Sequence, residues 1–201
     1  MTSLIEVVVA ADVEPWESIG LRVADGCSWI GGVCLRFVPA AASGPRIVGW
    51  TLTGSPLQPT EIDGLGTAHV DDVQPQSWVH PLGAESFDHL VVMTSSLERT
   101  CGEIERVTGQ PLKRVRQAGA VRQGFHRLGP MIIEVVENDR VTDPIASFWG
   151  FVLIVDDIHE VAGRLGPDLL SPPKPAVQPG RFIASFRSQA GLGLPIALMS
   201  R

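Results

Sequence analysis

Three apolar runs along the chain are each followed by a polar turn of the kind that starts a helix. They read LIEVVVAADVEPW, FDHLVVMTSSLERT and FWGFVLIVDDIHEV, and they begin at Leu4, Phe87 and Phe148. Each apolar run has the length of a β-strand, and the polar residues after it are typical of helix N-termini. The recurrence predicts a repeated unit in which a strand leads into a helix.

The middle stretch carries the most complete unit. Its strand, residues 89–93, is followed by Ser95 and Glu98 in the spacing of a capping box, which predicts a helix start. The residues that give this helix one apolar face are Leu97, Cys101, Ile104 and Val107. Gly109 and Pro111 end the helix. Three strand-like runs follow at residues 112–116, 124–128 and 131–136. The predicted order is βαβββ.

The third stretch repeats this order, and the first is a shorter version of it. In the third, Asp156 or Asp157 starts the predicted helix, and Gly166 and Pro167 end it. The predicted strands of the third stretch are residues 151–155, 181–187 and 195–199. Those of the first are residues 5–10, 21–24, 27–30, 33–38 and an appended 47–52, with a short helix at residues 16–19.

Residues 56–85 are rich in Pro, Gly and Asp without a sustained period, so we interpret them as a linker. They separate a degenerate unit, residues 1–55, from a domain over residues 86–201. That domain contains two units, residues 86–140 and 147–201. One βαβββ unit is too small to bury both faces of its sheet, so the units are expected to pair in an α+β fold. The first unit then either covers the paired sheet or contacts a second subunit as a homodimer.

Composition narrows the class of protein. Of 201 residues, 44% are hydrophobic and 19% are charged, which fits a globular protein and not a disordered one. The net charge of −6 gives no reason to expect nucleic acid or a membrane as partner. The basic residues Lys113, Arg114 and Arg116 are interpreted as a solvated strand end. A charged-then-apolar leader and an apolar run of about 18 residues are both absent, which predicts a cytoplasmic location.

The three units differ chemically at two aligned positions. Aligned on the polar turn, the first strands bring together Ile5, His89 and Gly150. The last strands, GGVCLRFV, GPMIIEVVE and GLPIALM, bring together Arg36, Glu134 and Ala197. A repeat supplies scaffold, and function is expected where the copies differ. Only the middle unit has a potential metal ligand at both positions, so His89 and Glu134 are the candidate catalytic residues.

The order FDHLVV, SSLE, FHRLG and MIIEVVE resembles the vicinal-oxygen-chelate superfamily, which includes glyoxalases, bleomycin-resistance proteins and extradiol dioxygenases. Residues 87–199 cover two consecutive units, the usual complement for one cleft, and residues 3–52 resemble a third, degenerate copy. The resemblance implies a glyoxalase-like fold in which βαβββ units form a curled mixed sheet with a central cleft. It also implies one divalent metal in that cleft, such as zinc, nickel, manganese or iron.

In this superfamily the metal ligands come from the first and last strands of each unit. The resemblance therefore places His89 and Glu134 at two ligand positions, whereas the partner unit has no ligand side chain at the matching positions. A catalytic metal generally needs about three protein ligands, and the third would come from His80 or His126. Three interpretations stay open: a metal site, a metal-free ligand or catalytic role, and a structural pair. A buried Glu134 needs a partner in all three.

Further polar residues are candidate substrate ligands. Gln178, Arg181 and Arg187 flank or enter strands that are expected to face the cleft, and His126 lies on the strand next to Glu134. An arginine there would pair with Glu134 or with a substrate carboxylate. Alternatively, these residues form a solvated strand edge. Aromatic residues cluster in the third unit, so the predicted cleft wall suits an aromatic or acyl-type ligand.

Two functions are consistent with these residues, and in both the partner is a small molecule. The first is a lyase- or isomerase-type enzyme that acts on a small carbonyl or aromatic compound, with Glu134 as base or metal ligand and His89 as its partner. The alternative is a metal-free protein that binds and sequesters a small molecule, as resistance proteins of this superfamily do.

Overall fold

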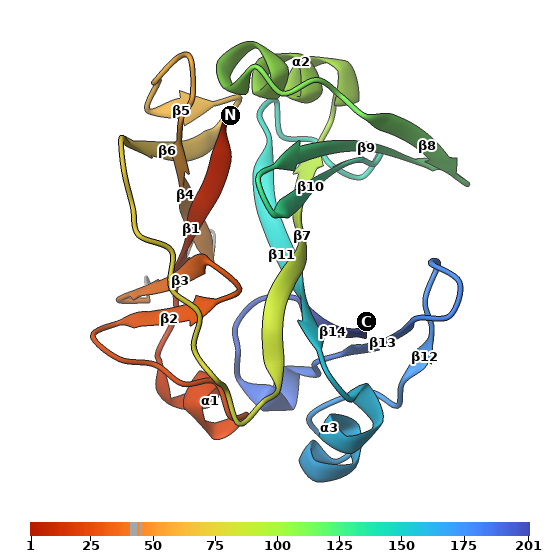
Figure 1. The fold of residues 1–201 in the computed structure, drawn as a ribbon. Coiled ribbons are helices and arrows are strands. Elements are labelled where there is room, and N and C mark those ends of the chain that lie inside the picture. Colours follow the sequence, from red (N-terminus) through yellow and green to blue (C-terminus); the bar gives the residue numbers. More distant parts are fainter. Residues whose placement is uncertain (41–43, 45) are drawn as a thin grey trace.

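The computed structural model describes residues 1–40, 44 and 46–201, and it contains two mixed β-sheets that pack against one another (Figure 1). The helices are α1 (Glu14–Ser18), α2 (Leu97–Thr108) and α3 (Ile158–Leu165). Helix α2 lies at one end of the molecule, and α1 and α3 lie at the opposite end. No helix among the described residues has the length and hydropathy needed to cross a membrane.

The eight-stranded sheet is formed by two βαβββ units that lie side by side. Its strands in spatial order are β12 (Lys174–Pro175), β13 (Phe182–Ser185), β14 (Ile196–Ser200), β11 (Ser147–Val155), β7 (Ala84–Thr94), β10 (Met131–Glu137), β9 (Val121–Leu128) and β8 (Arg114–Ala118). In each unit the first strand runs parallel to the last, and the two first strands pair antiparallel at the centre. The predicted α+β fold of glyoxalase-like βαβββ units is confirmed.

Helix α2 begins one residue later than the sequence pattern predicts. The Ser96 hydroxyl accepts a hydrogen bond from the backbone N–H of Arg99, which makes Ser96 the N-cap. The predicted capping box of Ser95 and Glu98 is wrong, because the Ser95 hydroxyl donates to the carbonyl of Asp143. Either serine can cap a helix, but only Ser95 has a glutamate three residues later, so the capping-box pattern points to the wrong serine.

The six-stranded sheet contains the degenerate unit and part of the predicted linker. Its strands in spatial order are β2 (Cys27–Ile30), β3 (Val33–Val38), β1 (Ser3–Ala10), β4 (Ile47–Thr53), β6 (Leu65–Val70) and β5 (Glu61–Ile62). Strands β5 and β6 lie within residues 56–85, where flanking turn residues hide their β character in the sequence. Residues 21–24 were expected to form a strand, but they make only an isolated bridge between Ala24 and Cys27.

Strand register fixes which residues of the two units in the eight-stranded sheet are equivalent. Glu134 pairs with Val91, so His89 lies two residues before the partner of Glu134. Gly150 lies two residues before the partner of Ala197 in the same way. The sequence alignment of these two units therefore agrees with their pairing.

The sequence alignment of the first unit is wrong by one residue. Arg36 pairs with Val8, so Glu6, and not Ile5, is the equivalent of His89. The pairing of β1 with β4 shifts register between Leu4 and Glu6. An irregularity of this kind adds a residue to one strand and is not visible in a pattern of apolar positions.

Strands β4, β5 and β6 form a fourth unit that has no helix. Strand β6 runs parallel to β4, as the last strand does to the first in the other units. Thr51 lies opposite Glu6 and pairs with Ala68. This pairing makes Gly49 and Ala68 the counterparts of the small residues at positions 150 and 197. Both sheets therefore follow one plan, and the six-stranded sheet is a reduced copy of the eight-stranded one.

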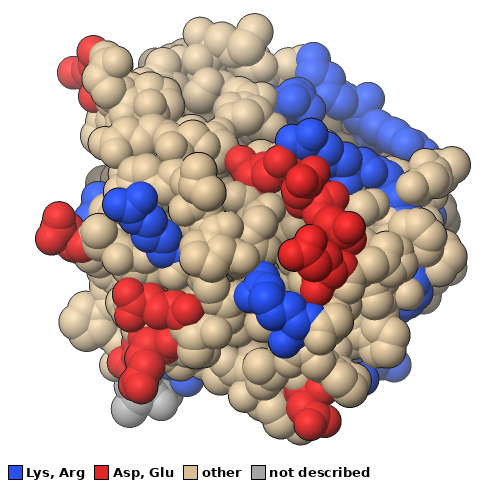
Figure 2. All heavy atoms as spheres, turned by 60° about the horizontal axis from the view of Figure 1, so that its bottom comes forward, with Lys and Arg blue, Asp and Glu red and all other residues tan. Residues whose placement is uncertain are grey.

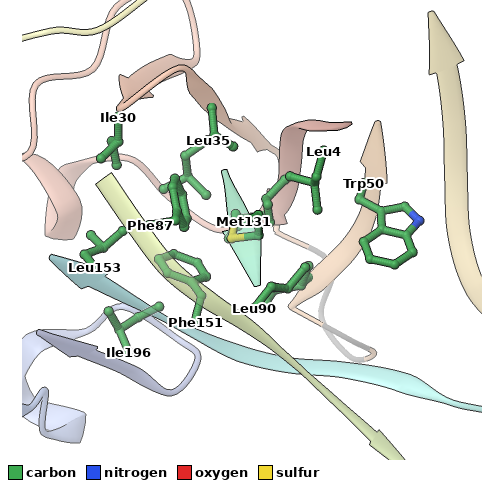
Figure 3. Close-up of a cluster of buried hydrophobic side chains, with 14 of the residues drawn as sticks. Leu4, Ile30, Leu35, Trp50, Phe87, Leu90, Met131, Phe151, Leu153 and Ile196 are labelled. Carbon is green, nitrogen blue, oxygen red and sulfur yellow. The ribbon is translucent and has the colours of Figure 1, made fainter. Parts of the chain in front are cut away.

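The main hydrophobic core lies between the two sheets (Figure 3). Leu90 and Val92 enter it from β7 and are fully buried. Leu4 and Trp50 enter it from the six-stranded sheet. Burying a side chain of this size contributes about 1.5–3 kcal/mol. The first unit therefore covers one face of the eight-stranded sheet, which is one of the two arrangements expected for it, and leaves the other face free for a cleft.

Candidate functional site

A cleft of about 530 Å³ opens on the face of the eight-stranded sheet that points away from the core. Alternate residues of a strand point to opposite faces, so the core residues of β7 alternate with His89 and Val91, which line the cleft. The remaining lining residues come from both units and are Met93, Gln123, Glu134, Val136, Trp149, Phe151, Val152, Ile183, Ser185, Phe186, Pro195, Ile196 and Ala197. Most of the lining is apolar.

A chain of polar contacts crosses the polar part of the cleft. His89 Nδ1 lies 2.7 Å from Asp88 Oδ2, and His89 Nε2 lies 3.2 Å from Glu134 Oε2. The side-chain amide of Gln123 donates to Glu134 Oε1. Arg181 Nη1 donates to Asp88 Oδ1 over 2.9 Å. The structure thus brings together the two predicted catalytic residues and links them to one predicted substrate ligand, Arg181.

A β-bulge in β7 brings Asp88 and His89 to the same side of the strand. His89 pairs with Val152 of β11, but the next residue, Leu153, pairs with Phe87, so Asp88 is an extra residue. Neighbouring residues of a regular strand point to opposite faces, and a bulge re-aims one of them. The bulge therefore explains how two consecutive side chains hydrogen-bond to each other.

Asp88 is the ionised hydrogen-bond acceptor in this row of polar contacts. Burial raises the pKa of Asp88, but the hydrogen bonds and charges of His89 and Arg181 outweigh burial and hold that pKa below its usual value. An ionised Asp88 accepts the Nδ1–H of His89, which leaves Nε2 facing Glu134. Nε2 of His89 and Oε2 of Glu134 then face each other, and an imidazole nitrogen and a carboxyl oxygen are groups that can exchange a proton.

The surroundings of Glu134 leave polar capacity for a ligand. Its side chain is 13% exposed, and the Gln123 amide holds one of its oxygens. The other polar atom of that amide, Gln123 Oε1, is buried with no hydrogen-bond partner among the described atoms. A buried acceptor without a partner is unfavourable, so a donor on a bound molecule would satisfy it. Within the part of the chain that the structure describes, no Lys or Arg lines the cleft.

The structure does not bring His80 or His126 to His89 and Glu134. His126 Nδ1 contacts the carbonyl of Gln110 at 3.1 Å, and its ring points to the face of β9 that α2 covers. His80 Nδ1 accepts from a backbone N–H, and its Nε2 contacts a carbonyl at 3.0 Å. Burial lowers the pKa of both histidines, and neither lines the cleft. Neither is therefore placed to act as the third metal ligand.

The residues of the cleft do not fit a divalent metal with three protein ligands. No group of three or more His, Cys, Asp or Glu side chains converges among the described residues. The partner position in β11 is closed by packing, because a Cβ on Gly150 would lie 2.1 Å from the carbonyl oxygen of Pro195. His89 and Glu134 alone supply two ligands, fewer than the roughly three of a catalytic metal site.

Of the other predicted substrate ligands, Gln178 joins the network and Arg187 does not. The side-chain oxygen of Gln178 accepts from Arg181 Nη1 at 2.9 Å. Arg181 Nε also donates to the carbonyl of Ser200, so this guanidinium is held beside Asp88 and outside the cleft lining. Arg187 is exposed and is not a lining residue.

Asp88 and Gln123 belong to the site but are not among the sequence candidates. Asp88 directly precedes His89 in the FDHLVV motif, which was the available signal. Strict alternation assigns Asp88 to the opposite face, and the bulge that re-aims it is a property of strand pairing. Gln123 reaches Glu134 from the neighbouring strand β9, and such a contact depends on register.

No protein-family model matches the sequence, and a search of curated proteins gives no match. Among solved structures, methylmalonyl-CoA epimerase from Mycobacterium tuberculosis is similar over 61% of this chain and 92% of its own, with 12% identity and a TM-score of 0.52. A mutant of 4-hydroxymandelate synthase from Streptomyces coelicolor is similar over 99% of this chain and 92% of its own, with 15% identity and a TM-score of 0.62. The chain has the vicinal-oxygen-chelate fold.

At 12–15% identity, these similarities establish the vicinal-oxygen-chelate fold and not a reaction. The match to the synthase spans nearly the whole chain, so it includes both sheets. The reduced six-stranded sheet is therefore part of this fold and not an unrelated addition. The predicted resemblance is confirmed for the fold.

Proposed function

We propose that the cleft catalyses a metal-independent proton transfer of the lyase or isomerase type on a small carbonyl or aromatic compound. Glu134 is the group that removes or returns the proton, and His89 is its partner. The observation that carries this proposal is the contact of His89 with both Asp88 and Glu134, a hydrogen bond on one side and an ion-pair distance of 3.2 Å on the other, in an otherwise apolar cleft. Groups of this kind, held within reach of a substrate, contribute about 10²–10⁴-fold to a proton transfer.

The hydrogen bonds give each group a defined task. Asp88 fixes the orientation of the imidazole, so that Nε2 of His89 exchanges its proton with Glu134. The Gln123 amide holds the carboxyl group in place through one oxygen. Each carboxylate oxygen has two lone pairs, so Glu134 keeps acceptor capacity for a substrate proton.

The residues that line the cleft suit a substrate whose reacting group is uncharged. Trp149 and Phe186 form an aromatic part of the wall, which suits an aryl or acyl group. No cationic side chain among the described residues lines the cleft, so nothing there neutralises a carboxylate beside Glu134.

Sequestration of a small molecule is the second candidate function. It is favoured by the half-exposed Trp149, whose ring offers a surface for stacking. It is also favoured by Gly150 and Ala197, which leave the ligand positions of the second unit without a metal-binding side chain.

Isotope exchange distinguishes the two functions. Wild-type protein is incubated in D2O with a panel of aldehydes, ketones and aryl carbonyl compounds, and deuterium next to the carbonyl group is measured by mass spectrometry. We expect enzyme-dependent exchange that falls at least about 100-fold in Glu134→Gln. Glu103→Gln is the matched control, because Glu103 is an exposed residue of α2 that pairs with Arg106. A compound that binds without any exchange, and binds equally well to Glu134→Gln, would establish sequestration instead.

Elemental analysis tests the metal-independent part of the proposal. Protein purified without chelator or affinity tag is expected to carry no stoichiometric zinc, nickel, manganese or iron. A metal present at one equivalent in wild type and lost from Glu134→Ala would contradict it. The homodimer expected from the sequence stays a prediction, which sedimentation over a wide concentration range checks.

A further inference from the structure

Three arginines form a rim on the cleft side of the eight-stranded sheet, outside the cleft itself. Across the sheet, Glu134 pairs with Phe125, and Phe125 pairs with Arg114. Paired residues point to the same face, so Arg114 lies on the face that carries Glu134. Arg116 pairs with the cleft residue Gln123 and shares that face.

Arg127 completes this arginine rim, because it lies two residues after Phe125 on β9 and alternation puts both on one face. The opposite face of the same hairpin is covered by α2. A Cβ on Gly124 would lie 2.8 Å from Cys101 Sγ of that helix. Val115 pairs with Gly124 and points the same way. The rim therefore faces the open, cleft side of the sheet.

The rim differs from the arginine on the helix side of the hairpin. Arg122 is neutralised there, because it pairs with Glu98 and Glu137. None of the three rim arginines forms an ion pair with any residue the structure describes. Lys and Arg side chains gather along one flank of the molecule, on the side to which β8 projects (Figure 2). Adjacent like charges repel one another, and this cluster stands out in a chain of net charge −6.

We propose that the arginine rim binds a phosphate or diphosphate group of the molecule whose head group enters the cleft. Guanidinium groups recognise phosphate oxygens through paired hydrogen bonds. Neighbouring strands lie about 4.8 Å apart, so the rim strand β8 lies about 10 Å from β10 and Glu134. The ligand class is therefore an uncharged acyl or aryl group joined by a linker of about 10 Å to a phosphate. The identity of the head group rests on the proposed function, whereas phosphate binding at the rim does not.

Inorganic pyrophosphate is the probe that tests the rim directly. Its affinity is measured by isothermal titration calorimetry at low ionic strength for wild type and for the triple variant Arg114→Gln, Arg116→Gln, Arg127→Gln. We expect the triple variant to bind about 100-fold more weakly, because removing each charge-assisted hydrogen bond to the phosphate weakens binding several-fold. Lys113→Gln is the matched control. It removes one charge next to β8 on the helix side, and it is expected to change the affinity less than twofold.

Equal affinity in wild type and the triple variant, or an equal loss in Lys113→Gln, would overturn the proposal. Binding of a single-stranded oligonucleotide that pyrophosphate fails to displace would also overturn it and make the rim a surface for long polyanions. The three arginines are surface residues, and an unchanged circular dichroism spectrum shows that the triple variant folds. Glu134→Gln is expected to bind pyrophosphate like wild type, so a failure of the proton-transfer proposal is recognised separately.

Discussion

The two sheets place a polar pair at equivalent positions, with arginine and glutamate in one sheet and histidine and glutamate in the other. In the six-stranded sheet Arg36 Nε donates to Glu6 Oε2, and the Thr51 hydroxyl donates to Glu6 Oε1 at 2.8 Å. Burial lowers the pKa of Arg36, but Glu6 raises it by more, so this arginine keeps its proton. Glu134 and His89 occupy the same positions in the eight-stranded sheet, and histidine, unlike arginine, is a residue that gains and loses its proton near neutral pH. The Glu6–Arg36 pair is therefore not suited to acid–base chemistry, whereas the His89–Glu134 pair is.

The other unit of each sheet, β11 to β14 in one and β4 to β6 in the other, has small residues at both ligand positions. Gly49 and Ala68 in one sheet correspond to Gly150 and Ala197 in the other. A Cβ on Gly150 would collide with a carbonyl oxygen 2.1 Å away, whereas one on Gly49 would lie 3.1 Å from the nearest oxygen. These glycines let the last strand approach closely. Packing therefore excludes a side chain at Gly150, and it restricts Gly49 less.

The largest effect is expected from making the second pair resemble the first. His89→Arg places a permanent cation between Asp88 and Glu134, so the proton is no longer exchangeable. Isotope exchange is expected to fall by about 10²–10⁴-fold, with the protein still folded. Mass spectrometry of the deuterated product measures this. Exchange at the wild-type rate would show that the imidazole takes no part.

The next largest effect is expected from substituting the equivalent glycines of the two sheets, Gly150 and Gly49. Gly150→Ala is expected to lower the free energy of unfolding by about 3 kcal/mol, because overpacking forces the backbone to move. Gly49→Ala is the matched control in the other sheet and is expected to cost about 1 kcal/mol or less. Urea unfolding followed by tryptophan fluorescence gives both values. A similar cost at the two positions would contradict the difference in packing between Gly150 and Gly49.

Asp88→Asn tests the contribution of an ionised Asp88 to stability. Among the residues that the structure describes, the six-stranded sheet has no equivalent carboxylate. The folded pKa of Asp88 lies below the unfolded value of about 3.9, so Asp88 adds stability above about pH 4 and loses it as pH falls through the folded pKa. At pH 7 the variant is expected to be about 1–3 kcal/mol less stable, because charge-assisted hydrogen bonds to His89 and Arg181 are lost. Urea unfolding at pH 7, 5 and 3 checks this. A difference from wild type that stays constant down to pH 3 would rule out an ionised Asp88 as its source.

Glu6→Gln is expected to have the smallest effect. Its partner Arg36 is 43% exposed, and ion pairs of such side chains contribute less than about 1 kcal/mol. The unfolding midpoint is expected to move little, and isotope exchange is expected to stay at the wild-type rate. A large loss of exchange in this variant would mean that the two sheets share one site.

Much of the eight-stranded sheet is predictable because its information is local. The apolar runs that become β7 and β11 are long, and the helices after them have polar caps and one apolar face. The six-stranded sheet is harder, since β5 and β6 are short and surrounded by turn residues. Their strand character comes from pairing with β4, a contact between residues far apart in the sequence.

The sequence by itself determined the repeated βαβββ order and singled out His89 and Glu134, because periodicity and residue type are local properties of the chain. Only the tertiary structure decided what surrounds that pair. The bulge that turns Asp88 toward His89 depends on how β7 pairs with β11. The oxygen that closes Gly150 belongs to Pro195, a residue distant in the sequence. Both are set by the register between strands, which no single stretch of sequence encodes.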